Sequence, residues 1–148
     1  MPRHFHGTPR QERALSAYVK LLRATDTVQA EAARSLTGEG LSPSQFAVLE
    51  ALYHVGPMCL SDLAHKILKT SGNLTLVARN LEKRGLAVRQ QSSTDRRFFN
   101  LAITEKGRKL MARIFPAHLE RIVELMNRLS PAQQDELARL CRQVGKNQ

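Results

Sequence analysis

The sequence predicts a mainly α-helical fold of the α+β class, with a winged helix-turn-helix core between N- and C-terminal dimerisation helices. Apolar residues recur at three- and four-residue steps over most of the 148 residues, which is a helical period. Two short segments, 61–68 and 71–84, are joined only by a tight turn, and residues 88–103 change to a two-residue period. The length fits one compact domain with helical extensions.

The first forty residues predict a loose arm and one long helix. The helix is expected over 10–35 and ends at Thr37-Gly38-Glu39-Gly40, because glycine supplies the stop. A second helix begins after Ser42, which can cap it while Gln45 closes a capping box. Gly56-Pro57 ends this second helix.

The next segment predicts the helix-turn-helix. Residues 58–60 form an extended link, and Ser61 is expected to cap the third helix. The fourth helix opens at residues 70–73 and ends at Gly85. Its inward-facing residues are Leu74, Val77, Ala78 and Leu81.

A β-hairpin, or wing, is predicted after Leu86. Its strands are expected at 88–91 and 97–103, with a polar tip at 92–96. In the second strand Phe99, Leu101 and Ile103 alternate with Phe98, Asn100 and Ala102.

Two further helices close the chain. Thr104 caps a long helix to about Leu129, in which Pro116 is expected to cause a kink because it has no N–H to donate. Ser130 and Gln133 predict a capping box at the start of the last helix.

Apolar residues outside the winged core predict a partner chain. They are Leu15, Leu22, Ile122, Met126, Leu137 and Leu140. One short core cannot cover all three flanking helices, so we expect a two-fold homodimer through them. The alternative is that these helices fold back onto their own core. The predicted domains are an arm and dimerisation helix at 1–36, the DNA-binding domain at 41–104 and dimerisation helices at 105–148.

The charge predicts a polyanionic partner. The net charge is +10, and between His65 and Leu110 eleven Lys and Arg residues face three carboxylates. Such a surplus attracts nucleic acid, although a solvated basic face is the alternative. The predicted cation-rich elements are a hairpin and a short helix rather than one long amphipathic face, so a membrane role is not expected.

No catalytic triad, paired carboxylates or phosphate-binding loop is visible, so an enzyme is not expected. Cys59 and Cys141 lack zinc-type spacing and are expected to be buried and inert, with a redox switch left open. We expect no metal and no cofactor. The sequence shows no signal peptide and no long apolar run, which predicts a cytoplasmic protein.

The fourth helix is expected to read bases. In a helix-turn-helix the second helix enters the major groove, where Asn pairs with adenine, Arg with guanine, and Thr or Leu contacts a thymine methyl. Capping is the alternative role for the polar residues at its start. The candidate DNA contacts on this helix are Ser71, Gly72, Asn73, Thr75, Leu76, Arg79 and Lys83.

The wing tip is expected to contact the flanking minor groove. Arg97 is the candidate for insertion into a narrow A·T-rich groove, and Arg96 for a phosphate. Asp95 would fix the Arg97 guanidinium by a bidentate pair. A solvated turn with a weak surface ion pair is the alternative.

These motifs resemble the MarR family of winged-helix regulators. The likeness rests on Leu81-Glu82-Lys83-Arg84-Gly85-Leu86, Asp95-Arg96-Arg97, and Leu101-Ala102-Ile103-Thr104-Glu105-Lys106-Gly107. It implies a homodimeric transcription regulator, usually a repressor, on a palindromic operator. Arg79, Asn80 and Leu76 depart from the usual family residues, so no operator sequence is carried over. A non-specific architectural DNA-binding protein is the alternative function.

The resemblance also implies an effector site between the dimerisation helices and the core, for a small phenolic or anionic ligand. The candidates by segment are Tyr18, Leu22, Phe46, Tyr53 and Ile114. Plain core packing is the alternative role for these five residues. The predicted first helix carries no cysteine, which argues against peroxide sensing as in one branch of the family.

Overall fold

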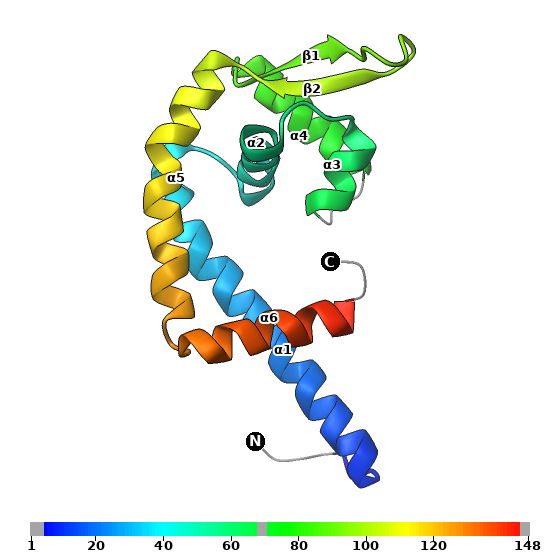
Figure 1. Cartoon of the computed structure of the whole chain (residues 1–148), viewed down its shortest axis with the longest axis vertical. Helices are drawn as coiled ribbons and strands as arrows, with labels where there is room; N and C mark the ends of the chain where they lie inside the picture. Colours follow the sequence, from blue (N-terminus) through cyan, green and yellow to red (C-terminus); the bar gives the residue numbers. More distant parts are fainter. Residues whose placement is uncertain (1–4, 68–70, 146–148) are drawn as a thin grey trace. The chain divides into compact units, whose positions relative to one another are not determined.

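The hairpin lies between the fourth and fifth α-helices, and the helices and the hairpin follow one another along the chain in the predicted order (Figure 1). The computed structural model describes residues 5–67 and 71–145. The predicted turn at 68–70 lies outside these residues. The elements are α1 (Pro9–Ala33), the 3-10 helix η1 (Arg34–Glu39), α2 (Pro43–Val55), α3 (Leu60–Ile67), α4 (Ser71–Lys83), β1 (Ala87–Gln91), β2 (Phe99–Ile103), α5 (Glu105–Met126) and α6 (Pro131–Gly145).

The chain divides into two compact units. One contains residues 35–123, with α2, α3, α4, the hairpin and most of α5, and we call it the winged unit. The other contains residues 1–34 and 124–148, with α1 and α6, and we call it the helical unit. The predicted domain boundary after residue 104 falls inside the winged unit.

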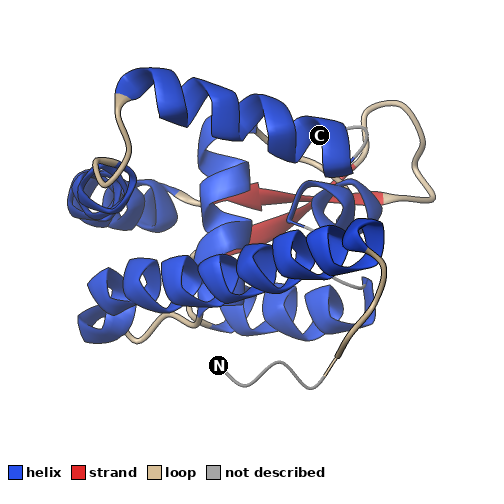
Figure 2. Cartoon of the chain, turned by 90° about the horizontal axis from the view of Figure 1, so that it is seen from below, coloured by secondary structure: helices blue, strands red, loops and turns tan. Residues whose placement is uncertain are grey.

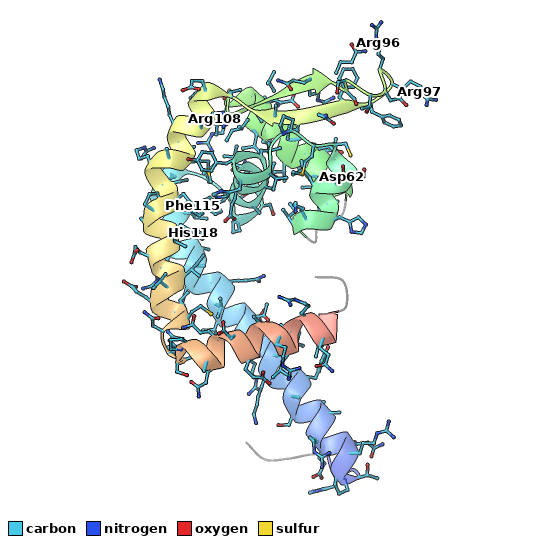
Figure 3. The ribbon with its side chains drawn as sticks, in the orientation of Figure 1. Asp62, Arg96, Arg97, Arg108, Phe115 and His118 are labelled. Carbon is cyan, nitrogen blue, oxygen red and sulfur yellow. The ribbon has the colours of Figure 1, made fainter. Side chains whose placement is uncertain are left out.

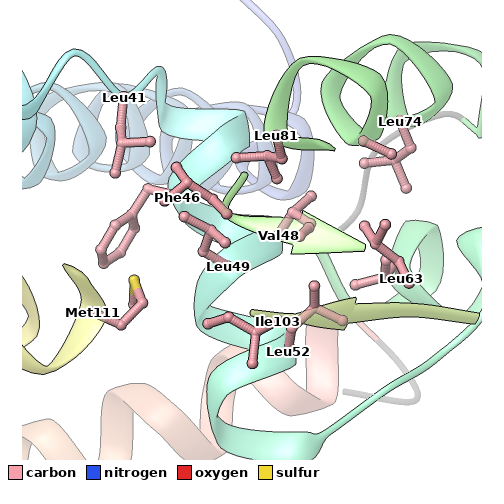
Figure 4. Close-up of a cluster of buried hydrophobic side chains, with 14 of the residues drawn as sticks. Leu41, Phe46, Val48, Leu49, Leu52, Leu63, Leu74, Leu81, Ile103 and Met111 are labelled. Atoms are coloured by element: carbon pink, nitrogen blue, oxygen red, sulfur yellow. The ribbon is translucent and has the colours of Figure 1, made fainter. Parts of the chain in front are cut away.

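The core of the winged unit is apolar and closely packed. Helices α2, α3 and α4 pack on one another, and the hairpin packs on α2 and α4. Leu49, Leu63, Leu81 and Met111 are completely buried in this core (Figure 4). Full burial of such a side chain contributes about 1.5–3 kcal/mol, so these positions give the unit much of its stability.

The sheet is a two-stranded antiparallel hairpin, drawn red in Figure 2. Ala87 pairs with Ile103, and Gln91 pairs with Phe99. Met58, in the predicted extended link, adds an isolated bridge to Leu101 on the other edge of β2. The link before α3 therefore anchors the base of the wing.

The second strand is shorter than predicted, and its alternation is incomplete. It begins at Phe99 rather than residue 97, so the tip spans residues 92–98. Leu101, Ala102 and Ile103 are all buried, whereas Phe99 is exposed. Protein packs on both faces of the hairpin at its base and on neither at its tip, so burial follows position along the strand instead of the two-residue period.

Most predicted helix ends are confirmed. Ser42 and Ser130 form reciprocal capping boxes with Gln45 and Gln133, and Thr104 Oγ1 accepts a bond from the Gly107 N–H. Each cap satisfies backbone donors that the first helical turn leaves free.

Other helix ends differ from the predictions. α3 begins at Leu60, and the Leu63 N–H bonds to the Cys59 carbonyl, so Ser61 lies inside the helix and does not cap it. The chain changes to η1 after Ala33, and α5 ends at Met126 while continuing through Pro116.

Two of the glycine-containing motifs meet where α4 ends and α5 begins. Gly85 has φ +72°, a backbone conformation that favours glycine, and its carbonyl accepts a 2.6 Å bond from Thr104 Oγ1. A Cβ at Gly107 would collide with the Leu86 carbonyl oxygen and with Ile103. The junction therefore needs glycine at both positions. This need explains why each of the two motifs contains a glycine.

The helical unit is packed differently. Neither α1 nor α6 contains a buried residue. Their exposed apolar side chains include Leu15, Tyr18, Leu21, Leu22, Leu137, Leu140 and Val144. An ion pair joins Arg128 to Glu31 at 3.1 Å. One chain alone thus leaves a large apolar surface in contact with water.

Candidate nucleic-acid interface

One face of α4 is exposed and the opposite face is buried. Leu74, Ala78 and Leu81 point into the core. Leu76, Arg79 and Lys83 recur at three- and four-residue steps and lie on the exposed face, where Leu76 is 60% exposed. An exposed leucine followed by two cations on one helix face suits contact with base methyl groups and phosphates.

The rest of the predicted reading helix is only partly described. Asn73 and Thr75 are exposed in the first turns of α4. The side chains of Ser71 and Gly72 lie outside the described residues. Neither Arg79 nor Lys83 has a side-chain partner among the residues that the structure describes.

An ion pair ties α4 to the wing. Arg89 Nε on β1 contacts Glu82 Oε1 at 2.8 Å. Glu82 is therefore paired with Arg89 and not with Arg79 or Lys83. The charges of Arg79 and Lys83 remain available to another partner.

The predicted bidentate pair is present at the wing tip. Arg97 Nε and Nη2 donate to the two carboxylate oxygens of Asp95 at 3.1 and 2.9 Å, and the Arg97 backbone N–H donates to Oδ1 at 3.0 Å. The Arg97 side chain lowers the pKa of Asp95, and its backbone N–H does so to a lesser degree. The carboxylate therefore stays ionised at neutral pH and orients the guanidinium, which is 83% exposed.

Side-chain bonds within the turn shape the tip. Ser92 Oγ accepts bonds from the backbone N–H groups of Thr94 and Asp95, and Gln91 Nε2 donates to the Arg96 carbonyl. Sequence reasoning missed these roles, although Ser, Thr and Asp commonly bond to nearby backbone in turns. The bonds hold Arg96 and Arg97 at the end of the hairpin, pointing away from the unit (Figure 3).

A second group of cations lies where α4 meets α5. A cavity of about 640 Å³ is lined by Glu39, Lys83, Arg84, Leu86, Lys106, Lys109, Leu110 and Arg113. Arg113 donates to both oxygens of Glu39 at 2.8 Å, and this pairing raises the pKa of Arg113. Arg84 donates to the carbonyls of Glu39 and Gly40, and Lys106 to that of Arg84. Much of this charge therefore holds the junction together.

The effector candidates occupy different environments. Phe46 and Ile114 are buried in the core of the winged unit, Tyr53 packs against it, and Tyr18 and Leu22 are exposed on α1. The core packing left open by the sequence therefore applies to Phe46 and Ile114. A shared ligand site for the five residues stays a prediction.

Sequence reasoning missed a buried histidine beside Phe46. His118 is 6% exposed, its Nδ1 lies 3.1 Å from Ser35 Oγ, and its ring centroid lies 4.4 Å from that of Phe46. Phe115 and His118 lie on the same stretch of α5 (Figure 3). The histidines are scattered in the sequence, and only packing reveals that this one is buried.

The thiols differ from expectation. Cys59 and Cys141 are half-buried rather than buried, and Cys59 Sγ lies 3.1 Å from Ser61 Oγ. Within residues 5–67 and 71–145 no group of three or more His, Cys, Asp and Glu side chains could hold a metal ion. In the same ranges no helix has the length and apolar character to cross a bilayer.

Comparison with known proteins agrees with this geometry. A family model described as the MarR family matches residues 41–98. Two regulators of Bacillus subtilis (strain 168) are similar over most of their length. The uncharacterized HTH-type transcriptional regulator YkoM is 37% identical over 90% of this chain and 87% of its own, and HTH-type transcriptional regulator MhqR is 38% identical over 92% and 94%. Transcriptional repressor MprA of Escherichia coli K12 is 28% identical over 75% and 64%.

Solved structures share the fold. Sco3205, a MarR family regulator from Streptomyces coelicolor solved in complex with DNA, superposes with a TM-score of 0.81 at 22% identity, over 96% of this chain and 90% of that one. NadR in complex with 4-hydroxyphenylacetate superposes with a TM-score of 0.77 at 24% identity, over the whole of both chains. At these identities the likeness concerns the fold.

Proposed function

Because the chain belongs to the MarR family of transcriptional regulators, we propose that it binds a palindromic operator as a homodimer and acts as a repressor. Each protomer presents the exposed face of α4 to the major groove and the wing tip to the flanking minor groove. The two half-sites lie roughly one helical turn, about 34 Å, apart. A repressor bound there would block transcription by occupying the promoter region.

One observation carries the proposal: Arg97 is held by Asp95 on an exposed, internally bonded turn. A guanidinium fixed in this way loses little side-chain entropy when it enters a groove. The negative potential of a narrow A·T-rich minor groove favours such an insertion. An exposed ion pair contributes little to the stability of a protein. Stability alone therefore does not explain why Asp95 holds Arg97 on the turn.

The exposed face of α4 supports base reading in the major groove. Arg79 can pair bidentately with guanine, Leu76 can contact a thymine methyl, and Lys83 suits a phosphate. Asn73 and Thr75 lie in the first turns, where a reading helix contacts base edges. For Ser71 and Gly72 the proposal rests on the sequence alone.

The homodimer is supported by the helical unit. Its two long helices have apolar faces without any buried residue in one chain. A second copy of the chain would cover these faces and set the spacing of the two reading helices. This spacing is what makes an inverted repeat the expected target.

A small phenolic or anionic effector would relieve repression. NadR, which shares the fold, was solved with a phenolic acid, and the five candidates Tyr18, Leu22, Phe46, Tyr53 and Ile114 include two phenols and three apolar residues. Adding 4-hydroxyphenylacetate to a protein–DNA complex and following fluorescence anisotropy tests this part. A complex unaffected by any phenolic acid would contradict it.

Selection of bound duplexes from a random pool tests the function, followed by anisotropy titration of the selected and scrambled duplexes. We expect an inverted repeat, bound about 10³-fold or more tightly than scrambled DNA, with an affinity that falls steeply with salt. An architectural DNA-binding protein would keep the salt dependence and lose the discrimination. Equal affinity for selected and scrambled duplexes would therefore overturn the proposal.

A further inference from the structure

The wing tip carries a large aromatic side chain that the protein does not bury. Phe98 is 59% exposed at the end of the hairpin. Its backbone is fixed on both sides, since its N–H donates to the Asp95 carbonyl at 3.1 Å and its carbonyl accepts from the Ser92 N–H at 3.0 Å. A bonded turn therefore fixes the backbone that carries the ring, and more than half of the side chain is exposed to solvent.

The ring lies beside the wing arginine. The Arg97 Cζ atom is 5.9 Å from the Phe98 ring centroid, while the same guanidinium is bidentate to Asp95. Carboxylate, guanidinium and phenyl ring thus form one connected group. Any surface that receives the guanidinium also meets the ring.

The surrounding charge indicates which surface that is. Asp95 is the single carboxylate among residues 92–98, and it is paired with Arg97. The Arg96 side chain has no partner among the described residues. An apolar ring beside Arg97, on a turn that carries a second cation in Arg96, matches a DNA minor groove, where phosphates line the rims and deoxyribose and base edges line the walls.

We propose that Phe98 enters the minor groove beside Arg97, packs against the deoxyribose wall and wedges partly into the adjoining base step. The proposal rests on the proposed function, because it requires the wing to contact the operator flank. Apolar wedges of this kind unstack base steps and favour deformable pyrimidine–purine steps such as TA. Phe98 would thus add a preference for flexible A·T-rich flanks that the arginine alone does not provide.

The test uses the duplex that the wild-type protein selects, with 2-aminopurine placed at the flanking steps. We expect the wild-type protein to raise 2-aminopurine fluorescence by unstacking the base, and Phe98→Ala to abolish this rise. Phe98→Ala should also weaken binding about tenfold, the size typical of losing one aromatic contact with a base. Phe98→Leu, which keeps apolar bulk, should lose less.

Two controls separate contact with DNA from support of the arginine. Phe98→Ala should leave the salt dependence unchanged because no charge is removed, whereas Arg97→Ala should reduce its slope by about one. In the Arg97→Ala background, Phe98→Ala should still weaken binding several-fold. If its effect vanishes there, the ring acts only by holding Arg97, and the proposal is wrong.

Phe99→Ala is the matched control variant. Phe99 is equally exposed, at 56%, but it lies on β2, paired with Gln91, and not on the tip turn that carries Arg96 and Arg97, so its removal should leave affinity unchanged. If the Phe98→Ala protein binds the duplex with wild-type affinity, the proposal is wrong while the operator function stays intact. Failure of the wild-type protein to select any duplex would overturn both. A changed mass of the free Phe98→Ala protein would assign the ring to a protein contact instead.

Discussion

The two units of this chain differ in how much of their apolar surface is buried. In the winged unit, Leu49, Leu63 and Leu81 are completely removed from solvent. In the helical unit, α1 and α6 bury no residue, and Leu22 and Leu140 remain almost half exposed. The winged unit therefore has the core of an independently stable domain. The helical unit leaves its apolar faces uncovered, and the proposed function assigns DNA contact to the winged unit and assembly to the helical unit.

The largest expected effect is a core truncation in the winged unit. Leu81→Ala should lower the free energy of unfolding by about 2–5 kcal/mol, because it removes a fully buried side chain and leaves a cavity. Urea denaturation followed by circular dichroism measures this. Leu76→Ala on the exposed face of the same helix is the control and should change stability by less than about 0.5 kcal/mol. Equal losses from both variants would contradict the assignment of the two faces.

The corresponding change in the helical unit should affect assembly and leave the winged fold intact. Leu140→Asp places a charge on an apolar face, and burying it unpaired at an interface should weaken dimerisation by about 3 kcal/mol, or more than a hundredfold. Sedimentation velocity over a concentration series measures this.

Leu76→Asp is the matched control for that experiment, because it makes the same change on the exposed face of α4. It should leave the mass unchanged. A Leu140→Asp protein that sediments like the wild type would show that α6 lies outside the interface.

A smaller effect is expected at the wing tip. Arg97→Ala should weaken binding to the selected duplex about tenfold and reduce the preference for A·T flanks, while the free energy of unfolding stays unchanged. Anisotropy titrations on A·T- and G·C-flanked duplexes measure this. A loss that is equal on both duplexes would indicate a phosphate contact and not groove insertion.

The smallest effect concerns the ionisation of Asp95. The Arg97 side chain is the main cause of its lowered pKa, so Arg97→Gln should raise this pKa toward the ordinary value of 3.8. A lowered folded-state pKa contributes stability above the unfolded value, and this is lost as pH falls through the folded value. Because this pKa is lowered, Asp95 stays ionised between pH 5 and 8. DNA affinity should therefore not change through the ionisation of Asp95 in that range. NMR titration of the carboxyl carbon measures the shift, and an unchanged pKa in the variant would contradict the pairing.

Local sequence was sufficient for features that depend on a few neighbouring residues. The capping boxes at Ser42 and Ser130 need only a hydroxyl and an amide three residues apart. Gly85 follows from the need for positive φ at the end of α4. The Asp95–Arg97 pair was likewise predictable, because the two residues are two positions apart on one turn.

Features that depend on tertiary packing were not predictable in this way. The two-residue period predicts a strand from Arg97, but it cannot show where the wing leaves the body of the unit. It therefore places Phe98 in the strand and groups the exposed Phe99 with the buried Leu101 and Ile103. Ser61 has the type of a capping residue, yet the bridge from Met58 to β2 fixes the preceding backbone and α3 starts at Leu60. The burial of His118 depends on Phe46, which is 72 positions away in the sequence.

We expect the uncovered faces of α1 and α6 to form an interface between two copies of the chain, which would place two DNA-reading units on one operator. Sedimentation equilibrium on the wild-type protein measures this. The expected mass is twice the 16.6 kDa of one chain, constant over micromolar concentrations. A mass of one chain over that range, with the protein folded, would contradict it.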